Sequence, residues 1–131
     1  MKSTILCKAI ILCILAGSLL LLPTVAVFAS DDTATAAPVP GKVTMVDFGA
    51  KTCVPCKMMA PILEELEKEY TERAAILFID VWENPEAGRK YGIQLIPTQI
   101  FYDAKGKEVF RHEGFMDKAA IVARLQKLGV R

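Results

Sequence analysis

The chain has 131 residues, of which 53% are hydrophobic, and a formal net charge of +1 at pH 7. This length suits one domain with a short extension. Sixteen basic residues against fifteen acidic ones leave no charge excess that would favour a nucleic acid or an anionic membrane as a partner.

The first 29 residues have the pattern of a secretory signal peptide. Lys2 and Lys8 flank an apolar start, Ala9 to Leu22 carries no charge, and small residues before Ser30 fit a cleavage site after Ala29. The alternative is an uncleaved membrane anchor, because residues 9–29 are about long enough to cross a bilayer. We therefore expect an exported protein, periplasmic or extracytoplasmic, and possible anchoring by that segment.

Cleavage at this point changes the cysteine count. The full chain has four cysteines, and only Cys53 and Cys56 lie beyond residue 29. Disulfides persist in the compartments that exported domains reach. The exported part therefore has one pair of thiols, and no other cysteine competes with it.

A short leader precedes the first expected strand. Residues 30–42 are small, polar and Pro-containing, which is typical of a flexible segment, so we expect the domain to span residues 43–131. VTMVDF, from Val43, predicts a strand buried on both faces, interrupted only by Asp47. From Cys56 onward the apolar residues follow helical spacing and predict an amphipathic helix: Met59, Ile62, Leu63, Leu66 and Tyr70.

The remaining segments predict, in chain order, a strand, a short helix, two strands in a hairpin and a last helix. AAILFIDVW, residues 74–82, predicts a second buried strand, and Asn84 followed by Pro85 predicts the start of a short helix. TQIFY and KEVFR flank a turn at 103–106, which predicts an antiparallel hairpin, and Asp117 can cap a last helix. This order predicts an α/β domain with parallel pairing, an antiparallel edge and about four strands.

The segment KTCVPCK, residues 51–57, admits three interpretations of its cysteine pair. A structural zinc site needs four ligands, and the chain offers no second pair at this spacing and a single histidine, His112. A structural disulfide would close a very small loop, and its entropic stabilisation falls as the loop shrinks. The pattern therefore favours a dithiol that is repeatedly oxidised and reduced, with no metal and no cofactor besides the Cys53–Cys56 disulfide.

The expected position of the two thiols gives them different roles. A cysteine at the start of a helix faces unpaired backbone amides and the positive end of the helix dipole, which favour its thiolate. Cys53 has this position, and Pro55 suits the first turn because it lacks an amide proton. Cys56 lies one turn further and should be less accessible. We expect Cys53 to attack and Cys56 to resolve the mixed disulfide.

Five segments together resemble a thioredoxin, over about residues 43–128. They occur in the family's order and at its spacing: VDF at 46–48, CVPCKMMAP at 53–61, YGI at 91–93, IPT at 96–98, and Gly114. The resemblance implies the thioredoxin fold and thiol–disulfide exchange. The leader is too short for the first strand and helix of a full thioredoxin, so we expect both to be absent.

The resemblance also assigns roles to single residues. Asp47 matches the buried acid that can take the proton from the resolving cysteine, and a carboxylate within an apolar strand is costly unless it has a task or partners. The alternative is a solvated Asp at the strand end. Pro97 matches the cis-proline that faces the disulfide, and the backbone at Ile96 is expected to bind an extended substrate, next to Val54 and Pro55.

The sequence departs from the family pattern near the dithiol. Thr52, Val54 and Gly49 stand where thioredoxins usually have Trp, Gly and Trp, and Ile76 is placed where they have a buried lysine that pairs with the acid. These differences indicate a smaller exported relative with its own partners. Without a cationic neighbour, the protonated form of Asp47 should be easier to populate.

The direction of electron flow is inferred from Val54. Its side chain cannot donate a hydrogen bond to the sulfur of Cys53, and less thiolate stabilisation favours a reducing dithiol. The hypothesis is a monomeric, exported protein-disulfide reductase that receives electrons from a membrane thiol transporter of the DsbD or CcdA type. Its clients would be protein disulfides, including those of apocytochrome c. The alternatives are a disulfide oxidase or isomerase, or a noncatalytic thioredoxin-fold binding module.

Overall fold

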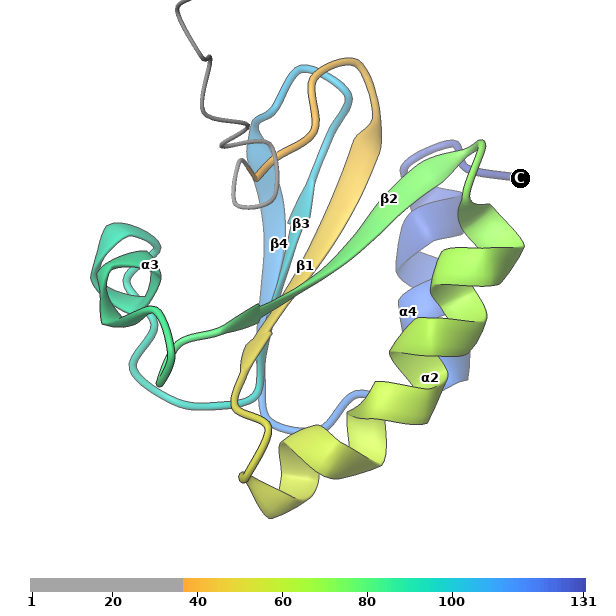
Figure 1. The fold of residues 1–131 in the computed structure, drawn as a ribbon. Coiled ribbons are helices and arrows are strands. Elements are labelled where there is room, and N and C mark those ends of the chain that lie inside the picture. The colour runs from red at the N-terminus through yellow and green to blue at the C-terminus, as the bar shows by residue number, and fades with distance from the viewer. Residues whose placement is uncertain (1–36) are drawn as a thin grey trace, which may run out of the picture. The chain divides into compact units, whose positions relative to one another are not determined.

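Four strands and three helices follow one another in the computed structural model, which describes residues 37–131. These residues belong to one unit, Asp32–Arg131. The expected signal peptide or anchor, at 1–29, and the leader up to residue 36 lie outside the described residues. In chain order the elements are β1 (Val43–Gly49), α2 (Val54–Tyr70), β2 (Ala74–Asp80), α3 (Pro85–Lys90), β3 (Thr98–Tyr102), β4 (Glu108–Glu113) and α4 (Lys118–Lys127) (Figure 1).

The strands form one mixed sheet in the order β2-β1-β3-β4. β1 pairs with β2 in parallel and with β3 in antiparallel orientation, and β3 and β4 form the antiparallel hairpin. The predicted element order and mixed pairing are therefore confirmed. In the part described, no strand or helix precedes β1, and no helix is long and apolar enough to cross a membrane.

The two inner strands are buried on both faces. Every residue of β1 is buried, as the apolar run predicted, because helices cover both sides of it. Met45 contributes to the core under α2 and α4, whereas Val46 and Phe48 contribute to the core on the α3 side. The prediction of a second fully buried strand was wrong: β2 lies at the sheet edge, and Phe78 is 42% exposed.

The helices cover the sheet unequally. α2 and α4 lie on one face and α3 on the other (Figure 1). The larger core is between the sheet and the α2–α4 pair, because both helices present an apolar stripe to it. The buried helical residues of this core are Met59, Leu63, Leu66, Tyr70, Ile121 and Leu125.

Two helix starts follow the predicted capping residues. The side chain of Asn84 accepts a hydrogen bond from the Ala87 amide at 3.1 Å, and that of Asp117 accepts one from the Ala120 amide at 2.8 Å. Each satisfies an amide that the first helical turn leaves without a partner. The short-range signals in the sequence therefore located these two helix starts correctly.

The buried face of α2 should dominate the stability of the domain. Leu66 has no exposed surface, so Leu66→Ala removes apolar contacts and leaves a cavity, and we expect the free energy of unfolding to fall by about 3 kcal/mol. Leu95, which is 52% exposed, provides the matched control: Leu95→Ala should change stability by less than about 0.5 kcal/mol. Urea unfolding of the two variants measures both values, and equal losses would contradict the core assignment.

Candidate active site

Three chain segments meet at one end of the strands. β1 and β2 are parallel and end opposite each other, since Gly49 pairs with Asp80. β3 runs the other way and begins at Thr98, which pairs with Phe48 near the end of β1. Three segments therefore lie at the same end of the sheet's strands: the cysteine loop after β1, the turn after β2 and the Ile96–Pro97 segment before β3. Loops at the carboxyl ends of parallel strands commonly form binding sites.

The two cysteines differ in exposure. Cys53 is the residue immediately before α2 and is partly exposed, whereas Cys56 lies inside the first turn and is 4% exposed. Both thiols are free. The Cys53 carbonyl accepts the Lys57 amide at 3.0 Å, and Pro55 occupies a first-turn position that needs no amide proton. A large reactant can therefore reach the sulfur of Cys53 more readily than that of Cys56.

The buried thiol holds its proton firmly. Burial, the hydrogen bond to Cys53 and the negative charge of Cys53 or Asp47 together raise the pKa of Cys56 to about 12, and burial is the largest cause. A hydrogen bond from the backbone at Ala50 acts in the opposite direction. At neutral pH Cys56 is thus a thiol, and it needs a base before it can act as a nucleophile.

Asp47 is a buried carboxyl group on the face of β1 that α2 covers. It has no exposed surface, and burial raises its pKa to about 6, although a hydrogen bond from Gln99 acts to lower it. On β2 its register partner is Phe78, whereas Ile76 pairs with Met45. Ile76 is therefore a diagonal neighbour of Asp47 on the same face of the sheet, and its match to the family's buried lysine stays a prediction.

Gln99 was not predicted to be part of the site. It lies on β3 directly opposite Asp47, is fully buried, and donates from Nε2 to Asp47 Oδ1 at 2.8 Å and to Met59 Sδ at 3.1 Å. Asp47 Oδ2 and Gln99 Oε1 have no hydrogen-bond partner among the described residues. The sequence held one signal for this residue, the single amide side chain within the strand TQIFY, whose five residues are all buried. A buried amide needs hydrogen-bond partners.

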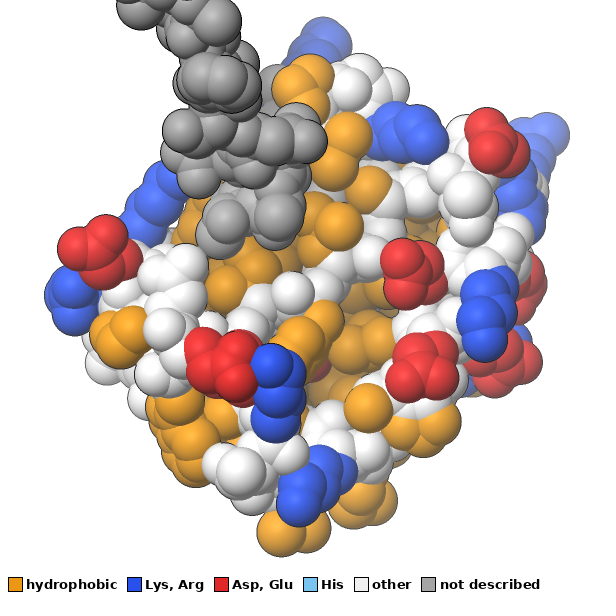
Figure 2. Space-filling view, viewed as in Figure 1, with side chains coloured by type: hydrophobic (Ala, Val, Ile, Leu, Met, Phe, Trp, Pro, Cys, Tyr) orange, Lys and Arg blue, Asp and Glu red, His pale blue; other side chains and the backbone are white. Residues whose placement is uncertain are grey.

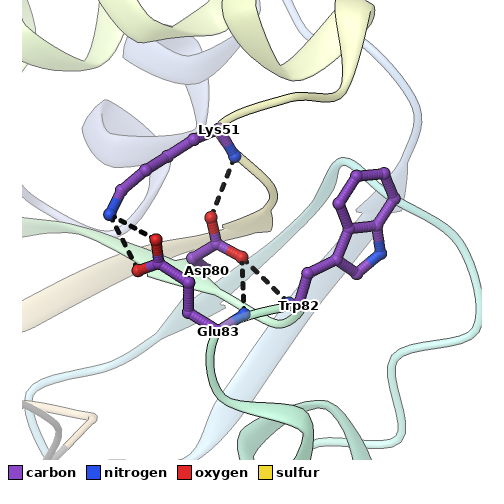
Figure 3. Close-up of polar contacts among 4 residues, drawn as sticks. All are labelled: Lys51, Asp80, Trp82 and Glu83. Atoms are coloured by element: carbon purple, nitrogen blue, oxygen red, sulfur yellow. Dashed lines mark hydrogen bonds and ion pairs between the residues drawn. The ribbon is translucent and has the colours of Figure 1, made fainter.

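Asp80 joins the cysteine loop to the turn after β2 (Figure 3). One carboxylate oxygen accepts the Lys51 amide at 2.9 Å, and the other accepts the amides of Trp82 and Glu83 at 2.9 and 3.0 Å. Burial tends to raise the pKa of Asp80, but these bonds and the charge of Lys51 outweigh it and lower the pKa. Lys51 also pairs with Glu83 at 2.7 Å on the surface, and the Trp82 side chain points away from this ion pair (Figure 3).

Gly49 leaves room beside the buried thiol. A Cβ atom at this position would lie 3.0 Å from the Phe78 ring and 3.1 Å from the Cys56 sulfur, so a larger residue would displace one of them. A half-open, largely apolar cavity of about 290 Å³ adjoins Cys56, lined also by Ala60, Leu63 and the Phe78 ring. Figure 2 shows the apolar hollow between β2 and α2.

The substrate-binding residues expected from the sequence lie at the same end of the strands as Cys53. Val54 is 71% exposed, and the Ile96–Pro97 peptide bond is cis, as the resemblance implied. Among the described residues, no hydrogen bond uses the backbone N–H or C=O of Ile96, whereas the carbonyl of Pro97 accepts the Gly114 amide at 2.7 Å. Two exposed apolar side chains are next to these residues in the sequence: Leu95 precedes Ile96, and Phe115 follows Gly114.

The arrangement suits proton and electron transfer at sulfur more than metal binding. Within residues 37–131, no group of three or more His, Cys, Asp and Glu side chains lies close enough to hold a metal ion. One accessible thiol, one buried thiol and one buried carboxyl group are adjacent instead. These are the groups that a dithiol needs to attack, resolve and store a proton.

Comparison with known proteins gives consistent results. The thioredoxin family model matches residues 24–127. A thioredoxin of Staphylococcus aureus is 45% identical over 85 residues, which cover 65% of this chain and 81% of that protein. The Fasciola hepatica thioredoxin structure is 35% identical, with a TM-score of 0.59, and covers 67% of this chain and 82% of that one. The exposed lipoprotein thioredoxin of Streptococcus pneumoniae is 26% identical, with a TM-score of 0.61, over 66% and 85%. The expected fold is confirmed.

The buried acid should make stability depend on pH. The folded chain keeps the proton of Asp47 up to about pH 6, whereas the unfolded chain releases it near the ordinary pKa of 3.8. The contribution of Asp47 to the free energy of unfolding is therefore most favourable below pH 3.8, and it is lost as the pH rises from 3.8 to about 6. The difference is about 3 kcal/mol. Urea unfolding at pH 4 and pH 8 should show that the wild type loses most of this difference, about 2 kcal/mol, relative to Asp47→Asn; equal losses would contradict the assignment.

The Asp80 carboxylate should hold the cysteine loop in place. Asp80→Ala leaves three backbone amides without their acceptor, so we expect about 1 kcal/mol lower stability and faster hydrogen exchange at Lys51. Asp103 is a matched control, because it accepts two backbone amides in the distant β3–β4 turn. Asp103→Ala should leave exchange at Lys51 unchanged, and a similar acceleration in both variants would show that Asp80 has no special role there.

Proposed function

Because the chain belongs to the thioredoxin family, we propose that it is an exported reductase of protein disulfides that acts through Cys53 and Cys56. Thiol–disulfide exchange is the activity of the family to which its CxxC motif belongs. One observation carries the finer proposal: an accessible thiol at a helix start has a buried thiol and a buried, proton-binding carboxyl group behind it.

The first step is an attack by Cys53 on a client disulfide. The Cys53 thiolate forms a bond to one client sulfur, and the bond between the two client sulfurs breaks. The first client cysteine leaves as a thiolate and takes a proton from solvent. The product is a mixed disulfide between Cys53 and the client. The helix start favours this step because its unpaired amides and dipole stabilise negative charge at Cys53.

The second step releases the reduced client. Asp47, as a carboxylate, takes the proton of Cys56, whose thiolate then attacks the Cys53 sulfur. The Cys53–Cys56 disulfide forms, and the second client cysteine leaves as a thiolate and is protonated. Two electrons have passed from the dithiol to the client, and both client sulfurs end as thiols. A base is required here because Cys56 otherwise keeps its proton at neutral pH.

The client would bind over the exposed apolar side chains around Cys53. The free backbone groups of Ile96 can pair with an extended client segment, with the exposed side chains of Val54 and Pro55 beside it and the buried ring of Pro97 behind it. A protein substrate suits this surface because it supplies both an extended backbone and apolar side chains.

The reducing direction is supported by the surroundings of the dithiol. The neighbouring Val54 is apolar and adds no stabilisation to the Cys53 thiolate, and the raised pKa of Cys56 means that the Cys56 thiolate is not stabilised. A dithiol with little thiolate stabilisation gives up its electrons more readily. A reductase outside the cytoplasm needs an external electron source. A membrane thiol transporter of the DsbD or CcdA type would fit, with apocytochrome c or misoxidised secreted proteins as clients.

Export is supported by two independent observations. The first 29 residues have the signal-peptide pattern, or that of an anchor at 9–29, and a structural relative is described as an exposed lipoprotein thioredoxin. The proposed domain organisation is a signal peptide or anchor at 1–29, a leader at 30–42 and a catalytic domain at 43–131. We propose that the domain acts as a monomer.

The activity should depend on both cysteines in different ways. We expect the purified domain to reduce insulin with dithiothreitol as electron source, and Cys53→Ser to lower the rate to that of dithiothreitol alone, because no nucleophile remains. Cys56→Ser should still attack and should accumulate a mixed disulfide with its client, visible on a non-reducing gel. Insulin reduction that survives Cys53→Ser would overturn the mechanism.

The reduction potential decides between reductase and oxidase. Thioredoxins lie near about −270 mV and the strong periplasmic oxidants near about −120 mV, and we expect a value close to the former. Equilibration with glutathione or dithiothreitol buffers measures it. A value near that of the oxidants would indicate an oxidase instead of a reductase. A dithiol that does not exchange with either buffer would indicate the noncatalytic binding module.

A further inference from the structure

Two buried oxygen atoms at the centre of the site have no hydrogen-bond partner. They are Oδ2 of Asp47 and Oε1 of Gln99, and both side chains are fully buried. An unpaired buried polar atom costs about 1–3 kcal/mol, so such atoms usually indicate a missing hydrogen or ligand. Both belong to side chains that already touch, through the 2.8 Å bond from Gln99 Nε2 to Asp47 Oδ1.

The orientation of the Gln99 amide follows from its contacts. Nε2 faces Asp47 Oδ1 and the Met59 sulfur at 3.1 Å, and both of these atoms accept hydrogen bonds. The two hydrogens of Nε2 are therefore used, and the opposite orientation would place an oxygen against two acceptors. Oε1 must consequently be the atom that lacks a donor.

A single proton on Asp47 would supply that donor. A protonated carboxyl group and a primary amide can form two hydrogen bonds in one ring: the amide N–H donates to one carboxyl oxygen, and the carboxyl O–H donates to the amide oxygen. The first of these bonds is present. A hydrogen on Oδ2 that points to Oε1 would satisfy both unpaired atoms together.

We propose that Gln99 is a positioning residue that holds the Asp47 carboxyl group in both protonation states. It donates from Nε2 to Oδ1 in the carboxylate, and it additionally accepts from Oδ2 at Oε1 in the acid. The base therefore stays in place when it takes the proton from Cys56 and when it gives the proton up. The inference rests on the proposed function, in which Asp47 is that base.

The surroundings leave Gln99 as the principal polar partner of the acid. β2 faces Asp47 with Phe78, β3 with Gln99, and α2 with Met59 and the ionisable thiol of Cys56. Among the described residues no cation shifts the pKa of Asp47, which responds to burial and to Gln99. A substitution at Gln99 should therefore change the pKa of Asp47 directly.

The pair can be observed without any activity measurement. In the reduced full chain carrying labelled glutamine, we expect the Gln99 side-chain carbonyl and amide resonances to titrate with a midpoint at about pH 6. The exposed Gln94 and Gln126 are internal controls and should not titrate with it. Asp47→Asn should abolish the Gln99 titration. Gln99 resonances that stay constant from pH 4 to pH 8 would overturn the proposal.

A crystal structure of the reduced chain at pH 5 tests the second hydrogen bond directly. We expect Oδ2 of Asp47 and Oε1 of Gln99 to lie within about 2.5–3.0 Å, because two oxygens approach so closely only around a shared proton. A separation beyond hydrogen-bond distance, or a water bound between the two oxygens, would overturn the ring geometry.

The functional consequence is a shift in the pH profile of the second step. Gln99→Leu removes one charge-assisted bond from the carboxylate and two weaker neutral bonds from the acid. Because the hydrogen bond from Gln99 acts to lower the pKa of Asp47, that pKa should rise in the variant. We expect the midpoint of the rate at which Cys56 resolves a preformed mixed disulfide to move up, by less than the roughly one pH unit that loss of the charge-assisted bond alone would give. Gln99→Met provides a second variant should the leucine not fit.

The double variant separates positioning from a general structural effect. In an Asp47→Asn background, Gln99→Leu should leave the remaining pH profile unshifted, because the group through which it acts is absent. An equal shift in both backgrounds, or no shift in folded Gln99→Leu and Gln99→Met, would overturn the proposal. If the wild type reduces no disulfide at any pH, the proposed function fails, while the Gln99 titration still tests the pair.

Discussion

The burial of one carboxyl group, Asp47, is the constraint on which the rest of the site depends. The central strand carries it under the helix that bears the dithiol, and among the described residues no cation shifts its pKa. Burial is unfavourable for the carboxylate and so raises its pKa toward neutrality. The same burial raises the pKa of Cys56. A base and a thiol that both bind protons tightly can then exchange one proton between them.

The scaffold makes this arrangement possible by burying the central strands and exposing the loops. β1 and β3 are enclosed on both faces, so Asp47 and Gln99 are held from opposite strands with little freedom to move. The cysteine loop is bound at its base by Asp80, on the neighbouring strand. Gly49 keeps the space next to the Cys56 sulfur open, and the Phe78 ring occupies part of it.

Local signals in the sequence predicted much of the fold. Asn84 and Asp117 cap the helices that follow them because a capping bond involves residues only three positions apart. The apolar run from Val43 predicted a strand buried on both faces, which β1 is. The run at 74–82 did not reveal that β2 is an edge strand, because strand order is set by pairing between distant segments and both kinds of strand can be apolar.

The sequence by itself determined the cysteine pair, the element order and the presence of an acid in an apolar strand, since each is written in adjacent residues. Only the tertiary structure decided which side chains surround that acid. Phe78 is the β2 register partner of Asp47 because strand register depends on how the whole sheet pairs, and Gln99 reaches the acid from a strand 52 residues away. Spacing along the chain carries no information about such contacts until the strands are aligned.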